Sequence, residues 1–289
     1  MPIISLIAAP GHLEPSLVST LQGAFGTTGD ALWLSPDEAA EFPVASRPPN
    51  LDDVRRDIAD FAVDLNFLEA GDRRKSLLVA DMDSTMIGQE CIDELAVEAG
   101  VGPRVADITA RAMNGELDFN EALIERVALL RGLPIEIIDH VISNRITLAS
   151  GGRTLVATMK ANGAKAALVS GGFVQFTRKI GAMIGFDETR ANTLLEAESK
   201  LTGEVRMPIL GREAKVEALM AFSRNKPQNA IAVGDGANDL NMIERAGLGV
   251  ALHAKPVVAA AAPLRIDHSD LTALLFLQGY SRDEFIQDK

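Results

Sequence analysis

The fold is decided by the stretch Leu77-Leu78-Val79-Ala80-Asp81-Met82-Asp83-Ser84-Thr85, in which an apolar run ends abruptly in two acids. The four apolar residues predict a buried strand of a parallel sheet, and open α/β sheets bind ligands at the carboxyl ends of their strands. Side chains two residues apart on an extended chain share a side. We therefore expect Asp81 and Asp83 to face one pocket while Met82 turns into the core. One carboxylate could bind a metal or attack, and the other could move a proton.

Two further apolar runs end in polar, glycine-rich sequence. They are Ala166-Ala167-Leu168-Val169-Ser170-Gly171-Gly172 and Ala230-Ile231-Ala232-Val233-Gly234-Asp235-Gly236-Ala237-Asn238-Asp239. Taken alone, Asp-Met-Asp-Ser-Thr would be interpreted as an ordinary polar loop after a strand. Three such strand ends in one chain would rarely arise by chance, so they indicate a functional site.

The composition is that of a soluble globular protein with a substantial core. The chain has 289 residues, 47% of them apolar and 24% charged, which allows one large domain or two modest ones. The formal net charge of -12 disfavours nucleic acid as a partner. A site for an anionic substrate must therefore create its own positive charge from a metal, from Lys or Arg, and from backbone amides.

The cysteine count and the hydropathy indicate the compartment. The single Cys91 excludes an internal disulfide and fits a reduced compartment. No apolar run approaches the roughly 20 residues that cross a bilayer, and the first residues lack a basic region typical of a signal peptide. We expect a cytoplasmic protein without a membrane partner.

Residues 1–72 are expected to form a small α+β domain. Strands are predicted at 3–9, 31–34 and 63–67, and helices at 14–25 and 51–61, with Asn50 as the cap of the second helix. This order resembles the ACT-type regulatory domain, but no ligand-binding motif accompanies it. A degenerate structural appendage and a sensor both remain open.

Residues 73–289 are expected to form an α/β domain with a doubly wound parallel sheet. About eighty residues separate Thr85 from Ser170, far more than the 10 to 12 or so that a parallel crossover needs, so an inserted helical cap is predicted at about 87–150. Such a cap could act as a lid that excludes water. Its helices are expected at 90–99, 104–113, 119–130 and 134–143. After the cap, helices and strands alternate. Helices are expected at 152–162, 213–223, 240–246 and 271–277, with another that begins near 173. Strands are expected to begin at 166 and 230 and to span 248–252 and 264–266, the last at an edge of the sheet, and a short β excursion is expected within 190–203.

Common nucleotide-binding and serine-hydrolase motifs are missing from the sequence. Gly234-x-Gly236 lacks the third glycine of a dinucleotide fingerprint, because an Asp stands at 239, and no P-loop occurs. No Gly-x-Ser-x-Gly elbow surrounds Ser170. These kinds of nucleotide binding and acyl transfer are disfavoured.

The remaining motifs favour oxygen chemistry around a hard cation. Asp81 and Asp235 could together hold Mg²⁺, which prefers carboxylates and water as ligands. Ser170 and the amides of Gly171 and Gly172 could form a nest for an anion. Lys215 could neutralise phosphoryl oxygens, although an isolated lysine on a helix is more often a solvated surface residue.

These stretches, with Lys215, resemble the four successive motifs of the haloacid dehalogenase-like phosphotransferases, and within them the phosphoserine phosphatase family. The resemblance runs from about residue 75 to 277, and Met82 stands where Phe is usual. It implies that Asp81 is the nucleophile that forms an aspartyl-phosphate, and that Asp83 protonates the leaving oxygen and then deprotonates water. It also implies that Mg²⁺ is bound by Asp81, Asp235 and the backbone carbonyl of Asp83, with Asn238 and Asp239 ordering the loop.

The resemblance further implies the residues that bind phosphoserine. Glu90 would bind the ammonium group, Arg126 the carboxylate, and the apolar pair Met113 and Phe119 would close over the substrate. Ser170, Gly171, Lys215 and Asn238 complete the expected substrate-binding set. The expected reaction is hydrolysis of O-phospho-L-serine to serine and phosphate, the last step of serine biosynthesis.

Three alternatives to this reaction stay open at this point. Two are a phosphatase of the same fold for another small phosphomonoester, and an enzyme that transfers the phosphoryl group to a second alcohol. The third is a non-enzymatic amino-acid sensor built on residues 1–72. The oligomeric state is also open, a homodimer included.

Overall fold

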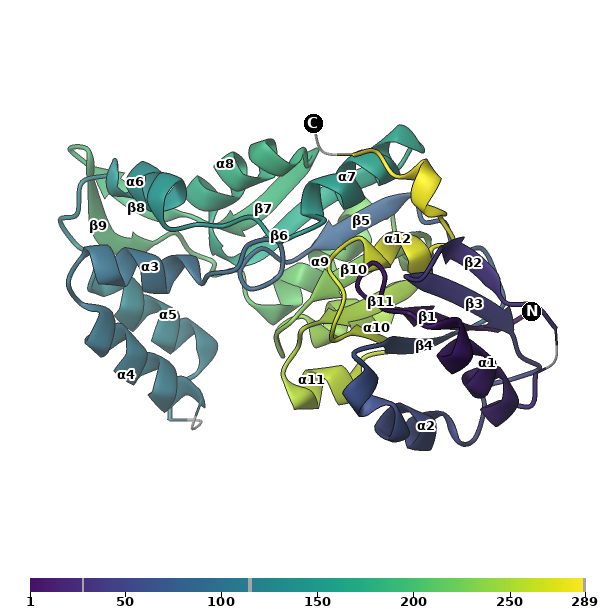
Figure 1. Cartoon of the computed structure of the whole chain (residues 1–289). Coiled ribbons are helices and arrows are strands. Elements are labelled where there is room, and N and C mark those ends of the chain that lie inside the picture. Colours follow the sequence, from purple (N-terminus) through teal and green to yellow (C-terminus); the bar gives the residue numbers. More distant parts are fainter. Residues whose placement is uncertain (28, 114–115, 288–289) are drawn as a thin grey trace.

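A six-stranded parallel sheet forms the centre of the molecule in the computed structural model, which describes residues 1–27, 29–113 and 116–287, with Met113 described by its backbone only (Figure 1). The strand order is β12-β11-β10-β5-β6-β7. The strands are β5 Leu77–Ala80, β6 Lys165–Phe173, β7 Glu188–Asn192, β10 Ala230–Gly234, β11 Leu248–Leu252 and β12 Leu264–Ile266. All neighbouring pairs are parallel, and the predicted edge strand at 264–266 is confirmed.

Helices cover both faces of this sheet, as the alternation of the sequence predicted. In β5, Leu77 and Val79 pack against α9 and α10, whereas Leu78 and Ala80 face the larger core that contains α7, α8 and α12. All four side chains are buried, because the strand lies between β6 and β10. The helices are α7 Gly152–Ala161, α8 Val174–Ile184, α9 Arg212–Phe222, α10 Leu240–Arg245, α11 Pro256–Ala261 and α12 Ala273–Leu277. The short α11 was not predicted from the sequence.

The inserted helices form a cap at one end of the molecule (Figure 1). They are α3 Cys91–Glu98, α4 Gly102–Met113, α5 Phe119–Ala128 and α6 Ile137–Asn144, close to the predicted ranges. A hairpin of β8 Leu194–Ala197 and β9 Lys200–Val205 packs against α5. Gly132 N donates to Leu201 O and Leu201 N to Leu133 O, both at 2.8 Å. The β excursion that the sequence predicted is therefore this hairpin, which packs against the cap.

The N-terminal unit is an antiparallel sheet with two helices on one face. Its elements are β1 Ile3–Ile7, α1 Pro15–Ala24, β2 Leu32–Ser35, β3 Ala39–Pro43, α2 Leu51–Asp57 and β4 Asp64–Leu68, with strand order β2-β3-β1-β4. The sequence analysis missed β3. Asn50 occupies the N-cap position of α2 as predicted, but its side chain makes no capping hydrogen bond and donates instead to Ala24 O at 3.0 Å.

Polar contacts join this unit to the edge of the central sheet. The Asn66 side chain donates to Arg265 O at 2.8 Å and accepts from Arg265 N at 2.9 Å, so it pairs with β12 as a neighbouring strand would. Asp64 accepts from the backbone amides of Asp267, His268 and Ser269. In the described part of the chain, none of the helices is long and apolar enough to span a membrane.

Candidate active site

Three carboxylates meet where β5 and β10 end. Asp81 follows β5 and Asp235 follows β10, while Asp239 comes from the turn before α10. One carboxylate oxygen of each lies within 4.8 Å of those of the other two. Asp81 and Asp239 are buried, and Asp235 is half-buried. The structure thus brings together the two aspartates that the sequence placed at separate strand ends.

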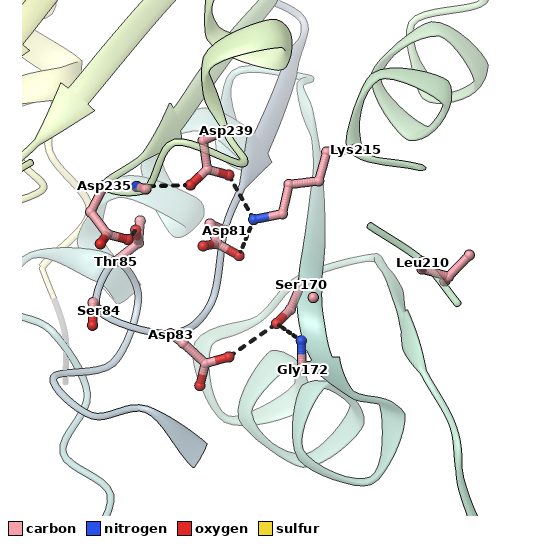
Figure 2. A network of polar contacts seen from close by, with 12 residues as sticks. Asp81, Asp83, Ser84, Thr85, Ser170, Gly172, Leu210, Lys215, Asp235 and Asp239 are labelled. Carbon is pink, nitrogen blue, oxygen red and sulfur yellow. Dashed lines mark hydrogen bonds and ion pairs between the residues drawn. The ribbon is translucent and has the colours of Figure 1, made fainter. Parts of the chain in front are cut away.

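Lys215 anchors this cluster from α9. Its Nζ lies 2.7 Å from Asp81 Oδ1 and 2.6 Å from Asp239 Oδ1, and the side chain is only 2% exposed (Figure 2). Burial by itself lowers the pKa of Lys215, but the charges of Asp81 and Asp239 outweigh it and raise the pKa above its usual value. Lys215 is therefore a permanent buried cation and not the solvated surface lysine of the alternative interpretation.

The turn after β10 has a steric reason for its glycines. Asp239 Oδ2 accepts a hydrogen bond from Gly236 N at 3.1 Å, which folds the turn back on itself. A Cβ at Gly234 would lie 2.3 Å from Asp239 Cγ, far inside contact distance. Glycine at 234 is thus what allows Asp239 to reach Lys215.

The cluster carries more negative than positive charge. Burial, followed by the charge of Asp81, raises the pKa of Asp239 to about 7 and also raises the pKa of Asp235. Three carboxylates face one ammonium, and Thr85 Oγ1 adds a neutral donor to Asp235 Oδ1 at 3.0 Å. An all-oxygen set with excess negative charge fits a hard divalent cation, which would relieve this repulsion.

Asp83 is turned away from the cluster and held by two donors. Cys91 N, at the start of α3, donates to Oδ1 at 2.9 Å, and Ser170 Oγ donates to Oδ2 at 3.1 Å. Ser170 Oγ in turn accepts from Gly172 N at 2.8 Å (Figure 2). Burial and then the charge of Asp81 raise the pKa of Asp83 to about 6. A carboxyl group with such a pKa can give and take a proton near neutrality.

A cavity of about 340 Å³ separates these acids from the cap. Its wall includes Asp81, Asp83, Ser170, Gly171, Asp235 and Asn238 from the sheet side, and Glu90, Phe119 and Arg126 from the cap side. Of the described residues predicted for the site, Lys215 and Asp239 lie behind this wall. The side chain of Met113 lies outside the described residues.

Burial shifts the pKa values of both Glu90 and Arg126. Burial, and then the charge of Asp83, raises the pKa of Glu90 to about 7, and Ser84 Oγ donates to Glu90 Oε1 at 2.7 Å. Burial lowers the pKa of Arg126, although Asp93 and Glu90 oppose this shift. An acid and a guanidinium thus face the same cavity from the cap, as binding of a zwitterion requires.

The sequence analysis missed some of the cavity wall. Ile92, Leu123 and Phe173 line it as apolar residues, and Lys255 lines it from the segment after β11. The signal for Lys255 was present, since β11 is a parallel strand whose carboxyl end must lie at the same edge as that of β10. A larger cavity of about 590 Å³ lies beside residues 67–76 and 246–249, and it contains none of the predicted site residues.

Comparisons with known proteins agree with this geometry. The model of the haloacid dehalogenase-like hydrolase family matches residues 78–244. The chain belongs to this family. Figure 2 shows one residue from each of the four motifs around the same site: Asp81, Ser170 and Asp235 from near the carboxyl ends of separate strands, and Lys215 from α9.

Several relatives of the family are named phosphoserine phosphatase. The protein of Archaeoglobus fulgidus is 46% identical over 205 residues, which are 70% of this chain and 59% of the relative. That of Streptomyces coelicolor is 40% identical over 86% of this chain and 62% of the relative. The chain therefore spans less than two thirds of these two relatives. The match to the Streptococcus thermophilus protein, 46% identical, covers 68% of this chain and 93% of the relative.

Solved structures show the same fold. A haloacid dehalogenase family hydrolase from Salmonella enterica serovar Typhi has a TM-score of 0.86 at 31% identity and covers 98% of this chain and 99% of its own. A substrate-bound phosphoserine phosphatase has a TM-score of 0.64 at 39% identity, covering 72% of this chain and 99% of its own. A phospho-aspartyl intermediate analogue of a phosphoserine phosphatase has a TM-score of 0.64 at 40% identity, covering 70% and 98%.

Proposed function

We propose that this protein is a Mg²⁺-dependent phosphatase that hydrolyses O-phospho-L-serine to L-serine and phosphate. The observation that carries the proposal is the arrangement of one cavity. Its sheet side presents Asp81 beside a cluster of carboxylates suited to a cation, and its cap side presents Glu90 and Arg126. The 40–46% identity to proteins named phosphoserine phosphatase supports the same choice.

In the proposed reaction Asp81 attacks phosphorus in line and becomes an aspartyl-phosphate. Asp83 first protonates the departing serine oxygen and afterwards deprotonates the water that breaks the acyl phosphate. Its raised pKa, about 6, suits both steps. Lys215 holds the Asp81 carboxylate in position through their 2.7 Å contact. A bound Mg²⁺, with Asp81, Asp235 and the backbone carbonyl of Asp83 as its proposed ligands, would supply positive charge to the phosphoryl oxygens.

Other residues are proposed to bind the two ends of the substrate. Ser170, Gly171 and Asn238 line the cavity next to Asp81, where the phosphoryl group would lie. On the cap side, Glu90 would accept the ammonium group and Arg126 would bind the carboxylate through its planar fork. Phe119, together with Met113, would close over the apolar part of the substrate.

A phosphate-release screen over small phosphomonoesters, with and without Mg²⁺, tests the reaction. We expect the highest kcat/KM for O-phospho-L-serine and loss of activity on removal of divalent ions. A tenfold preference for another phosphomonoester would identify that compound as the substrate in place of phosphoserine. Transfer to an added alcohol faster than hydrolysis would identify the enzyme as a phosphotransferase. No phosphate release from any of them would reject the enzymatic proposal and leave the sensor hypothesis.

Arg126→Ala tests recognition of the carboxylate. We expect kcat/KM for phosphoserine to fall about 10- to 100-fold, since a charge-assisted hydrogen bond to a carboxylate is lost. Phosphoethanolamine lacks the carboxylate, so its kcat/KM should change little. Arg111→Ala is the matched control, because Arg111 lies on the cap but pairs with the half-buried Glu125 and does not line the cavity. Equal losses for both substrates would contradict the role of Arg126.

We further propose a domain boundary near residue 72, a cap at about 87–150, and action in the cytoplasm, where Cys91 would stay reduced. The separate sheets of residues 3–68 and 77–266 support the boundary. A homodimer stays a hypothesis that sedimentation can test.

A further inference from the structure

We propose that Lys255 captures the anionic substrate at the mouth of the active-site cavity. The proposal deepens the proposed function, because it assigns a binding role to a residue that none of the four sequence motifs contains. It concerns the approach and retention of the phosphorylated substrate and not the chemical step.

The charge of the cavity wall creates the need for such a residue. Four carboxylates line the cavity, namely Asp81, Asp83, Glu90 and Asp235. The two cations among the described lining residues are Arg126 and Lys255. A phosphomonoester dianion must therefore enter an acidic cavity in a protein whose net charge is -12. A bound Mg²⁺ would offset part of this charge at the reacting end of the cavity, and a cation near the entrance would attract the substrate on its approach.

The two cations stand on different parts of the molecule. Arg126 belongs to α5 of the cap, whereas Lys255 follows β11 of the central sheet. β10 and β11 are parallel, with Gly234 paired to Ala251, so the segment after β11 lies at the same edge as Asp235. Lys255 therefore contributes positive charge from the side of the cavity that holds the reacting acids.

The backbone of Lys255 is fixed while its ammonium group stays available. Lys255 O accepts hydrogen bonds from Val258 N at 2.8 Å and Ala259 N at 3.0 Å, and Pro256 follows it at the start of α11. Two residues earlier, His253 N donates to Ile266 O at 2.7 Å. The Lys255 side chain is exposed, and its Nζ makes no hydrogen bond or ion pair with another described residue. A cation with a fixed base and no internal partner is suited to bind an incoming anion.

The test compares Lys255→Gln with Lys226→Gln. Lys226 is a matched control because it is also exposed and also precedes a proline. It lies before β10, at the amino ends of the strands, away from the cavity. Both substitutions change the net charge equally. At about 0.02 M ionic strength we expect Lys255→Gln to lower kcat/KM for phosphoserine about fivefold with kcat unchanged. Lys226→Gln should stay within a factor of 1.5 or so of the parent protein.

Salt and charge reversal sharpen the comparison. The fivefold gap should shrink to less than about twofold at roughly 0.5 M salt, because the Debye length shortens. Lys255→Glu should lower kcat/KM further, and Lys255→Arg should retain it. Equal losses for the Lys255 and Lys226 variants would overturn the proposal in favour of a net-charge effect. A fall in kcat with unchanged KM would also overturn it, since Lys255 would then act in the chemical step.

A binding measurement separates this proposal from the proposed function. Calorimetry with inorganic phosphate on the Mg²⁺-loaded protein should show about fivefold weaker binding for Lys255→Gln, and unchanged binding for Lys226→Gln. This comparison stands even if the parent protein releases no phosphate from phosphoserine, a result that would reject the substrate alone. Unchanged phosphate affinity in Lys255→Gln would reject the role of Lys255.

Discussion

Replacement of Lys215 by methionine is expected to destabilise the protein by about 3–5 kcal/mol. The Lys215 ammonium makes ion pairs at 2.7 and 2.6 Å and is 2% exposed. At an effective dielectric constant of about 20, each pair attracts by about 6 kcal/mol. The measured loss should be smaller for two reasons. The variant no longer has to desolvate an ammonium, and Asp239 can take up a proton once its cation is gone.

Urea unfolding followed by circular dichroism, in metal-free buffer, measures this loss. Lys160→Met is the matched control, because Lys160 also pairs at 2.7 Å, with Asp187, but both side chains are about one third exposed. Solvent screening should limit its cost to less than about 1 kcal/mol. Adding Asp239→Asn to Lys215→Met should cost less than the two single losses combined, since the residues contact each other. Similar losses for the Lys215 and Lys160 variants would refute the argument that burial sets the strength of this contact.

Three further outcomes are expected. Asp81→Asn should bind Mg²⁺ more weakly and form no acyl phosphate, as acid-quench trapping of labelled phosphate would show; trapped phospho-protein would disprove its role. Asp83→Asn should slow both formation and breakdown of the acyl phosphate, and undiminished turnover would contradict the assigned proton transfers. The pKa of Asp239 is about 7 when folded against a usual value of 3.8, so the metal-free protein should lose stability as pH rises between these values. Mg²⁺ affinity should rise over the same range as protons leave, and pH-independent affinity would exclude Asp239 from the charge balance of the site.

The sequence predicted the parts of the site that lie at strand ends. An apolar run that ends at Asp81 or Asp235 can be recognised from neighbouring residues alone, because the buried part of a parallel strand is apolar and the residues just after it are polar. Lys215 could be placed only by resemblance to a family. Its helix position indicates a surface residue, and its burial depends on two acids that are distant along the chain.

The missed strand β3 shows why other parts could not be predicted. Ala39-Ala40-Glu41-Phe42-Pro43 has an acid at its centre and a proline at its end, which argues against a strand with a buried face. Glu41 is nevertheless buried, because Arg73 donates to both of its carboxylate oxygens, at 2.8 and 3.0 Å. The partner that makes the buried acid acceptable lies 32 residues along the chain. Local pattern holds no information about such a pair.

Contacts between the N-terminal sheet and the central sheet bear on the proposed domain boundary near residue 72. One face of the N-terminal sheet packs on α1 and α2, but Ile7 and Leu68 belong to the core of the central domain. β4 also covers β12, which is the edge of the six-stranded sheet. An uncovered edge strand is a template for aggregation, so this cover is useful whether or not the unit binds a ligand. β12 in turn supports the segment after β11 through the bond of His253 N to Ile266 O, two residues before Lys255. The N-terminal unit therefore helps to support the end of the sheet that carries the candidate active site. Although it is a separate stretch of the sequence, it is not an independent appendage.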